Sequence, residues 1–380
     1  MFKIIIVGTA YPFRGGMAAF NERLTEAFLK ENNNVYIENF KLQYPNFLFP
    51  GKTQYANWDA PKNIKIESTI NSINPLNWIK IGLKIKKIKP DILIIGYWIP
   101  FMAPCFGTIA KIVKHNKHTK IISLLHNILP HEKRIGDKIL SKYFVKNSDA
   151  FVSLSKSVLQ DLKTLDTKNK PKIFSPHPLY DHYGDIIDKN TAIKNIGLDP
   201  KYKYILFFGL IRDYKGLDIL IDAFSDSRFK KNNIKLIIAG EFYSNRDKYI
   251  NKINKLKLNS QIILHDKFIP DPDVQSYFCA ADIIAQPYKT ATQSGVTQIG
   301  YHFEKPMLVT NVGGLAEIIP NEKVGYVVEP NPKDIADKLI NFFEKNRTNE
   351  FHKNIIIEKK KYSWNNITNA FKTIIKQLQG

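Results

Sequence analysis

Two basic side chains lie in a short stretch bounded by glycines. Residues 207–216 read Phe-Phe-Gly-Leu-Ile-Arg-Asp-Tyr-Lys-Gly, which places Arg212 and Lys215 between Gly209 and Gly216. Arginine offers a fork that matches phosphate oxygens, and lysine supplies a point charge. An apolar run before the stretch predicts a strand, and the pattern after it predicts a helix. Since anions bind at strand ends and helix N-termini, we predict that this loop binds a diphosphate, with ordinary surface charges as the alternative.

A second stretch combines a strand end with small polar residues. Residues 286–298 read Gln-Pro-Tyr-Lys-Thr-Ala-Thr-Gln-Ser-Gly-Val-Thr-Gln. We predict that a strand ends at Pro287 and that a helix begins at Ser294 or Gly295. Ser294 is a candidate N-cap, and Gly295 would let a ligand approach the backbone. The free N–H groups of this helix start could hold a second phosphate, and an ordinary capped helix is the alternative.

Alternating strands and helices must position these stretches. In the first half, near-continuous Ile, Leu and Val runs indicate strands covered on both faces, at 3–8, 34–40, 91–96, 120–125, 150–154 and 172–175. Helical patterns separate them, at 17–30, 76–88, 104–114, 137–145 and 157–165. The span 41–75 is irregular and long for a plain connection, so we expect an active-site or substrate loop there.

A second alternation follows the polar segment 181–200, which fits a linker. Its predicted strands are 204–209, 235–240, 261–265, 282–286, 307–310 and 325–328. Its predicted helices are 217–224, 246–256, 273–280, 296–303, 315–319 and 332–344, with a last helix at 364–378. The pattern predicts an α/β protein of two Rossmann-like, doubly wound parallel-sheet domains facing a cleft. The expected domains are 1–180, with 364–380 packing back on it, and 181–363.

The composition describes a basic, folded chain. A net charge of +21, from 56 Lys+Arg against 35 Asp+Glu, favours nucleic acid, anionic lipid or phosphorylated partners, although a general bias toward lysine would also produce it. Cys105 and Cys279 lie in apolar runs and fit a reducing compartment. No apolar run is long enough for a membrane span or a signal peptide, so we expect a cytoplasmic protein. The basic, apolar segment 76–89 fits a packed helix, with peripheral docking at the inner face of the cell membrane as the alternative.

The second half resembles the donor domain of glycosyltransferase family 4, the group 1 enzymes of the GT-B fold. The stretch 207–216 resembles the family's diphosphate loop, and Ile-Ile-Ala-Gly-Glu at 237–241 resembles its Ala-Gly strand end. Lys-Pro-Met-Leu-Val-Thr-Asn-Val-Gly-Gly-Leu-Ala-Glu at 305–317 resembles its Pro-Val-Ile, Gly-Gly and Glu segment. Tyr-Ser-Trp at 362–364 resembles the start of the closing helix, which in this fold crosses back to the first domain.

The first half also resembles the family, although more loosely. Together the two halves extend the resemblance over nearly the whole chain. Gly15-Gly16 is similar to its glycine loop, and Leu-Leu-His-Asn at 124–127 is similar to the strand end whose histidine contacts the sugar. The candidate catalytic residues are Arg212, Lys215 and His126. The candidate donor-binding residues are Gly15, Gly16, Gly209, Glu241, Gln293, Ser294, Gly295, Val296, Gln298 and Glu317. The candidates for the acceptor side are His131, Glu132 and His177.

One pair of positions departs from the family pattern. The family usually carries two glutamates eight positions apart near this helix, and alignment on Pro287 and Pro306 places Ala291 and Ile299 there. Neither side chain can hydrogen-bond a sugar or ribose hydroxyl. Neutral hydrogen bonds could come instead from Thr292, Gln293 and Gln298.

The resemblance implies a retaining, metal-independent glycosyltransferase of hexosyltransferase type. It would move a sugar from a nucleotide sugar to a glycan or lipid-linked acceptor, in surface polysaccharide or glycolipid synthesis. We expect no metal, no cofactor beyond the donor and no nucleic-acid partner, since the Asp-Pro-Asp of 271–273 fits a turn with a helix cap. Arg212, Lys215 and a helix N-terminus would stabilise the leaving diphosphate. The alternatives are a nucleotide-sugar epimerase on the same fold and an inactive nucleotide-sugar binder.

Overall fold

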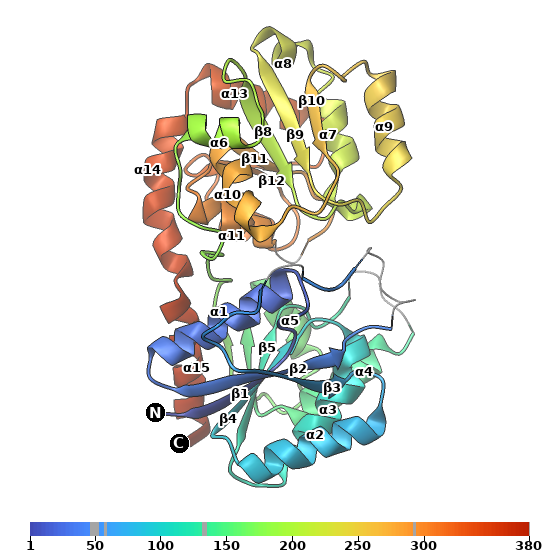
Figure 1. Cartoon of the computed structure of the whole chain (residues 1–380), viewed down its shortest axis with the longest axis vertical. Coiled ribbons are helices and arrows are strands. Elements are labelled where there is room, and N and C mark those ends of the chain that lie inside the picture. Colours follow the sequence, from blue (N-terminus) through green and yellow to red (C-terminus); the bar gives the residue numbers. More distant parts are fainter. Residues whose placement is uncertain (46–52, 57–58, 131–134, 292–293, 380) are drawn as a thin grey trace. The chain divides into compact units, whose positions relative to one another are not determined.

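The computed structural model divides into two compact units (Figure 1). Unit 1 comprises residues 1–178 and 363–380, and unit 2 comprises residues 179–362. The residues that the structure describes are 1–45, 53–56, 59–130, 135–291 and 294–379. Within these ranges, no helix is both long enough and apolar enough to cross a bilayer.

Unit 1 is built on a parallel sheet of seven strands in the order β3-β2-β1-β4-β5-β6-β7. The strands are β1 Lys3–Val7, β2 Asn34–Leu42, β3 Ile66–Asn71, β4 Ile92–Tyr97, β5 Lys120–Leu125, β6 Ala150–Ser153 and β7 Lys172–Phe174. Every residue of β4 is buried, as predicted for a strand covered on both faces. The strand order reverses between β1 and β4, which is where ligand crevices form in such sheets.

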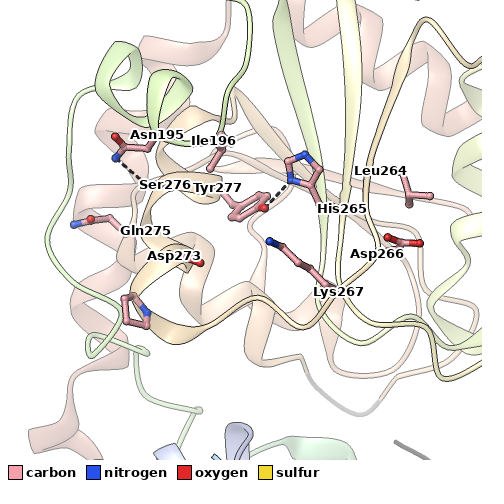
Figure 2. A pocket seen from close by; sticks show the side chains of 11 residues that line it. Asn195, Ile196, Leu264, His265, Asp266, Lys267, Asp273, Gln275, Ser276 and Tyr277 are labelled. Atoms are coloured by element: carbon pink, nitrogen blue, oxygen red, sulfur yellow. Dashed lines mark hydrogen bonds between the residues drawn. The ribbon is translucent and has the colours of Figure 1, made fainter. Parts of the chain in front are cut away.

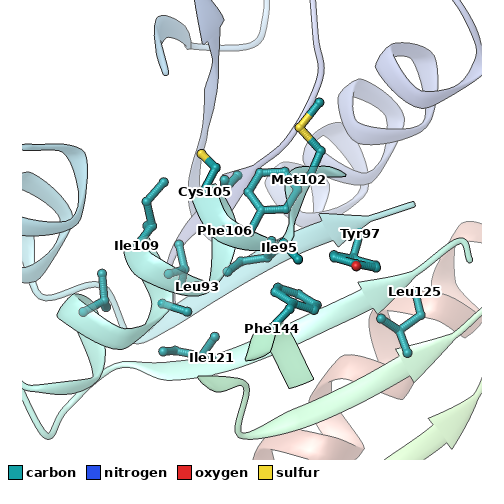
Figure 3. Packing of buried hydrophobic residues seen from close by; sticks show 14 of the residues in the cluster. Leu93, Ile95, Tyr97, Met102, Cys105, Phe106, Ile109, Ile121, Leu125 and Phe144 are labelled. Atoms are coloured by element: carbon teal, nitrogen blue, oxygen red, sulfur yellow. The ribbon is translucent and has the colours of Figure 1, made fainter. Parts of the chain in front are cut away.

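Helices cover both faces of this sheet. One face carries α2 Pro75–Ile88, α3 Ala103–Lys114, α4 Asp137–Asn147 and α5 Lys156–Lys163, with a 3₁₀ turn at Pro100–Met102. The other face carries α1 Gly16–Lys30 and the last helix, α15 Trp364–Gln379. Figure 3 shows Phe106 and Ile109 of α3 packed with Leu93 and Ile95 of β4 and with Phe144 of α4. The predicted return of the last helix to the first sheet is confirmed.

Unit 2 is built on a parallel sheet of six strands in the order β10-β9-β8-β11-β12-β13. The strands are β8 Lys203–Phe208, β9 Ile234–Ala239, β10 Ile262–His265, β11 Ile283–Gln286, β12 Met307–Thr310 and β13 Gly325–Val328. The order reverses between β8 and β11, and these two strands precede the two stretches singled out in the sequence. The topology therefore brings both stretches to one crevice position.

The helices of unit 2 alternate with its strands. They are α6 Lys189–Asn195, α7 Leu217–Ala223, α8 Ser227–Lys231, α9 Arg246–Lys255, α10 Asp271–Ala280, α11 Gly295–His302, α12 Leu315–Ile318, α13 Pro332–Glu344 and α14 Thr348–Glu358, with 3₁₀ turns at Asp213–Lys215 and Lys359–Tyr362. Side chains of α7, α9, α13 and α14 share one core with the central strands. The predicted fold of two doubly wound α/β units is confirmed.

Three element predictions were wrong. The span 41–75 contains the edge strand β3, whose sequence Ile-Glu-Ser-Thr-Ile-Asn is too polar to show a buried pattern. The predicted linker 181–200 contains α6, which Asp188 caps by accepting a hydrogen bond from the backbone of Thr191. The Asp-Pro-Asp of 271–273 is the first turn of α10, and Pro270 occupies the N-cap position.

Candidate active site

The loop after β8 is held in a conformation that requires glycine. Gly209 has a φ of 97° and Gly216 a φ of 68°, both in the left-handed region. A Cβ atom on Gly216 would lie 1.9 Å from the carbonyl oxygen of Pro287, and one on Gly240 would lie 2.1 Å from that of Gly209. The ends of β8, β9 and β11 therefore approach one another through bare backbone.

Lys215 is a buried cation in this loop. Its relative exposure is 8%, and its Nζ lies 3.2 Å from the position that a Cβ on Gly209 would take. Burial, and secondarily the charge of Arg212, lowers the pKa of Lys215 to about 8. No carboxylate within the described residues offsets this effect. Because a buried ammonium is costly without a countercharge, the position favours binding of an anion.

Arg212 stands at the exposed side of the same loop. Its guanidinium lies 5.2 Å from the ring centroid of Tyr243. The acid between the two cations, Asp213, accepts a hydrogen bond of 2.9 Å from the hydroxyl of Tyr249 and pairs with Lys248 at 3.3 Å. The loop's own carboxylate is thus directed to α9 and does not neutralise Lys215.

The second loop ends where α11 begins, at Gly295, as predicted. Ser294 occupies the N-cap position, but its side chain makes no capping hydrogen bond; its Oγ lies 3.2 Å from the hydroxyl of Tyr288. A Cβ on Gly295 would meet the ring of Tyr180 at 2.8 Å, so the missing side chain here makes room for that ring. The predicted N-cap position of Ser294 is confirmed, but its hydroxyl contacts the buried Tyr288 instead of capping the helix.

Tyr288 joins the two loops, although no motif in the sequence singled it out. Its side chain is 3% exposed, and its ring centroid lies 5.7 Å from Nζ of Lys215. Its ring also packs edge-on against Tyr214, at 5.9 Å. Its hydroxyl contacts Ser294, and its carbonyl accepts a 2.5 Å hydrogen bond from Thr310. Its place immediately after Pro287 at a strand end was the only available hint.

Gln298 is a buried amide one turn into α11. It has no exposed surface, and neither amide atom has a hydrogen-bond partner within the described part of the chain. An unmade hydrogen bond at a buried amide costs about 1–3 kcal/mol, so a ligand would be a suitable partner. Ala291 and Ile299, which stand where the family pattern has glutamates, are buried at 8% and 4% exposure. Gln293, also predicted to bind donor, lies outside the described residues.

The remaining donor-side candidates of unit 2 divide into two groups. Val296 lies beside Gly209, with its Cγ2 3.7 Å from the position of a Cβ there. Glu241 is buried at the end of β9, and its carbonyl accepts a 2.8 Å hydrogen bond from the backbone of Ile211. These two residues therefore adjoin the Lys215 loop. Glu317 is exposed in the short helix α12, and no described contact joins it to that loop.

In unit 1, two candidate histidines share one aromatic cluster. The ring of Phe20 lies 4.8 Å from His126 and 4.9 Å from His177, edge-on to both, and 5.3 Å from Trp364. Burial lowers the pKa of His126 to about 3, with His177 as a second cause. Burial likewise lowers the pKa of His177 to about 4. Both rings are therefore neutral at pH 7 and suited to hydrogen bonding rather than to ionic contacts.

The glycine loop after β1 leads directly into α1. Gly15 is exposed with a φ of 105°, and a Cβ placed on it would meet no atom within 4 Å. Gly16 is the first residue of α1 and is also exposed. The backbone here is open to a ligand, as the prediction requires. His131 and Glu132, predicted on the acceptor side, lie outside the described residues.

A separate cavity of about 710 Å³ opens beside the edge strand β10. Figure 2 shows His265 and Lys267 at the strand end and Gln275 and Tyr277 on α10. His265 Nδ1 lies 2.6 Å from the hydroxyl of Tyr277. None of the predicted site residues lines this cavity. The structure also shows no cluster of three or more metal-binding side chains within its described ranges.

The segment that forms most of unit 2 matches a known family. Residues 188–362 match the family model of glycosyl transferases group 1, and they contain both loops at the β8–β11 reversal. Residues 188–362 are thus similar to the glycosyltransferase group 1 domain. The prediction of a glycosyltransferase is thereby confirmed.

The relatives of this glycosyltransferase agree with that match. It is 26% identical to an uncharacterized glycosyltransferase of Methanocaldococcus jannaschii, over 100% of this chain and 99% of that protein. It is 22% identical to the O-antigen chain mannosyltransferase C of Escherichia coli, over 69% of this chain and 68% of that protein. The structure of Anabaena HepE in complex with UDP-glucose superposes with a TM-score of 0.75 at 14% identity and covers 100% of both chains. The fold is therefore GT-B.

Proposed function

We propose that this glycosyltransferase belongs to family 4 and transfers a hexose from a nucleotide sugar to a glycan or lipid-linked acceptor, with retention of configuration and without a metal ion. The observation that carries the proposal is the buried cation Lys215 beside Gly209 at the β8–β11 reversal. A diphosphate would supply the countercharge that this position lacks among the described residues. The complex of HepE with UDP-glucose supports a nucleotide-sugar donor. The O-antigen mannosyltransferase relative supports a role in surface polysaccharide synthesis.

In the proposed mechanism, charge develops on the phosphate as its bond to the anomeric carbon breaks. Arg212, Lys215 and the free N–H groups at the start of α11 stabilise that charge. The acceptor oxygen forms its bond to the anomeric carbon on the same face and passes its proton to an oxygen of the leaving phosphate. The product sugar keeps its configuration, and the nucleoside diphosphate is released.

We assign the donor side to unit 2 and the acceptor side to unit 1. In unit 2, Glu241, Val296 and Gln298 would contact the donor beside the cations, with Gln298 hydrogen-bonding a hydroxyl in place of a carboxylate. In unit 1, Gly15 and Gly16 remain proposed donor-binding residues, because their backbone is exposed. His126 would contact the transferred sugar, and His177, His131 and Glu132 would serve the acceptor.

A non-catalytic nucleotide-sugar binder is the second candidate, because Ala291 and Ile299 are apolar where the family pattern has carboxylates. The comparisons give no support to an epimerase. A thermal-shift screen with UDP-, GDP-, ADP- and CMP-sugars, followed by mass spectrometry of the donor after incubation with acceptors, separates the candidates. Transfer, or slow hydrolysis of one donor, supports the enzyme, whereas binding without any turnover favours the binder.

The variants Arg212→Ala and Lys215→Ala test the assignment of the site. Both should lose the donor-dependent thermal shift and turnover while keeping a cooperative unfolding transition. Lys248→Ala is the matched control, because it removes one positive charge from the exposed neighbour of the same loop. If all three variants showed the same thermal shift and turnover, the loop of Arg212 and Lys215 would not be the donor site.

A further inference from the structure

The outward side of α2 exposes a row of aliphatic side chains. Leu76 is 78% exposed, Leu83 52% and Ile79 44%. The opposite side of the helix buries Ile81 and Ile85 in the core of unit 1. At the helical rotation per residue, the three exposed side chains fall within a sector of about 60°. They therefore form one stripe rather than scattered surface contacts.

Lysines border this stripe. Lys80 and Lys87 are exposed and lie next to Leu76 and Leu83 around the helix. The segment 73–89 contains five lysines and no acidic residue. Lys84, which lies farther from the stripe, pairs instead with Glu38 and Glu67, each at 2.7 Å. Lys80 and Lys87 are therefore available to an external partner, whereas Lys84 forms ion pairs within unit 1.

The same face continues across α3 and α4. Helices α2, α3 and α4 together carry nine lysines and one aspartate, and α4 also exposes Ile139 at 73%. The helices on the other face of the sheet, α1 and α15, carry four basic and two acidic residues. Unit 1 thus has a strongly basic face, here called the α2–α4 face, and a nearly balanced one.

We propose that the α2–α4 face docks on an anionic lipid bilayer, with the α2 stripe in the headgroup interface and the lysines against lipid phosphates. A nucleic acid would use the charges but would leave the aliphatic stripe uncovered. A lipid interface uses both, because apolar burial and attraction to anionic headgroups add together there. The inference stands without the proposed transfer activity, and it would bring the chain to a lipid-linked acceptor.

The test is sedimentation of the full chain with vesicles of phosphatidylcholine and phosphatidylglycerol, compared with phosphatidylcholine alone. We expect binding only to the anionic vesicles. The double variants Lys80→Glu/Lys87→Glu and Leu76→Asn/Leu83→Asn should each weaken it roughly ten-fold or more. The matched control Lys30→Glu/Lys376→Glu makes the same charge change on exposed lysines of α1 and α15, and it should bind as the wild type does. Unfolding curves confirm that each variant is folded.

Three outcomes would overturn the proposal. Equal loss of binding in the control would mean that net charge alone attracts the chain. Full binding by Leu76→Asn/Leu83→Asn would mean that the stripe is not inserted. Absence of vesicle binding would mean that the face does not dock on lipid. A dimer in light scattering that Leu76→Asn/Leu83→Asn breaks would then mean that a second copy covers the stripe. Because no donor is present, none of these results depends on transferase activity.

Discussion

At the scale of the residue, burial of the Lys215 cation both lowers the stability of the free protein and favours binding of an anion. A cation buried without a countercharge among the described residues destabilises the free protein, and it strengthens binding of any anion that reaches it. The sequence could single out Lys215 and Arg212, because glycines on both sides mark a constrained loop. It could not show that Lys215 is buried and Arg212 exposed, since that difference arises from packing against Tyr288 and Gly209.

We predict that Lys215→Met stabilises the fold at pH 7. The folded pKa of Lys215 is about 8 against an ordinary 10.5, so the unfolded chain binds more protons between these pH values. The penalty is therefore complete below pH 8 and is relieved as the pH rises toward 10.5. From this shift, removal of the charge should raise the free energy of unfolding by up to about 3 kcal/mol at pH 7, and less at pH 9.5.

Urea denaturation at the two pH values measures this difference. Lys248→Met is the control, because Lys248 is exposed beside the same loop. A Lys215→Met variant that is no more stable than the wild type at pH 7 would contradict the assignment of Lys215 as a buried cation.

We also predict that binding of a nucleoside diphosphate takes up a proton at pH 8.5. Lys215 is mostly neutral there in the free protein, and a bound phosphate favours its charged form. Calorimetry in two buffers of different ionisation enthalpy should show an uptake of roughly half to one proton. Lys215→Met should show none, and an equal uptake by the variant would assign the proton to another group.

At the scale of the element, the site depends on two loops that one tyrosine connects. We predict that Tyr288→Phe, which loses the contact with Ser294 but keeps the ring near Lys215, weakens diphosphate binding only a few-fold, as expected for about 1 kcal/mol. Tyr288→Leu removes both contacts and should weaken binding at least about ten-fold. Titration calorimetry measures both variants, and equal losses would show that the ring does not position Lys215.

The elements that the sequence predicted well are those with continuous apolar runs. Strands such as β4 and β9 are buried along nearly their whole length, so their patterns are unambiguous. Short amphipathic elements were missed because few of their side chains are buried: α8 buries only Phe229, and α14 buries Phe351 and Ile355. The sequence predicted the N-cap position of Ser294 but not its hydrogen bond, because its side chain contacts the hydroxyl of Tyr288 rather than the helix backbone.

At the scale of the whole molecule, the composition gave the net charge but not its placement. The +21 surplus is unevenly distributed in unit 1, where the α2–α4 face is basic and the opposite helices are nearly balanced. The family match, at residues 188–362, lies within unit 2. The sequence motifs were most specific in that same part of the chain, and for unit 1 they supplied only a glycine loop and a histidine.

The central claim is that the loops at the β8–β11 reversal bind the diphosphate of a nucleotide sugar through Lys215 and Arg212. Titration calorimetry should compare the nucleoside diphosphate that most stabilises the chain with its nucleoside. Two charge-assisted contacts predict that the diphosphate binds roughly a hundred-fold more tightly, and that Lys215→Ala and Arg212→Ala each remove most of this advantage. Equal affinity for nucleoside and nucleoside diphosphate, or an advantage that both variants retain, would contradict the claim.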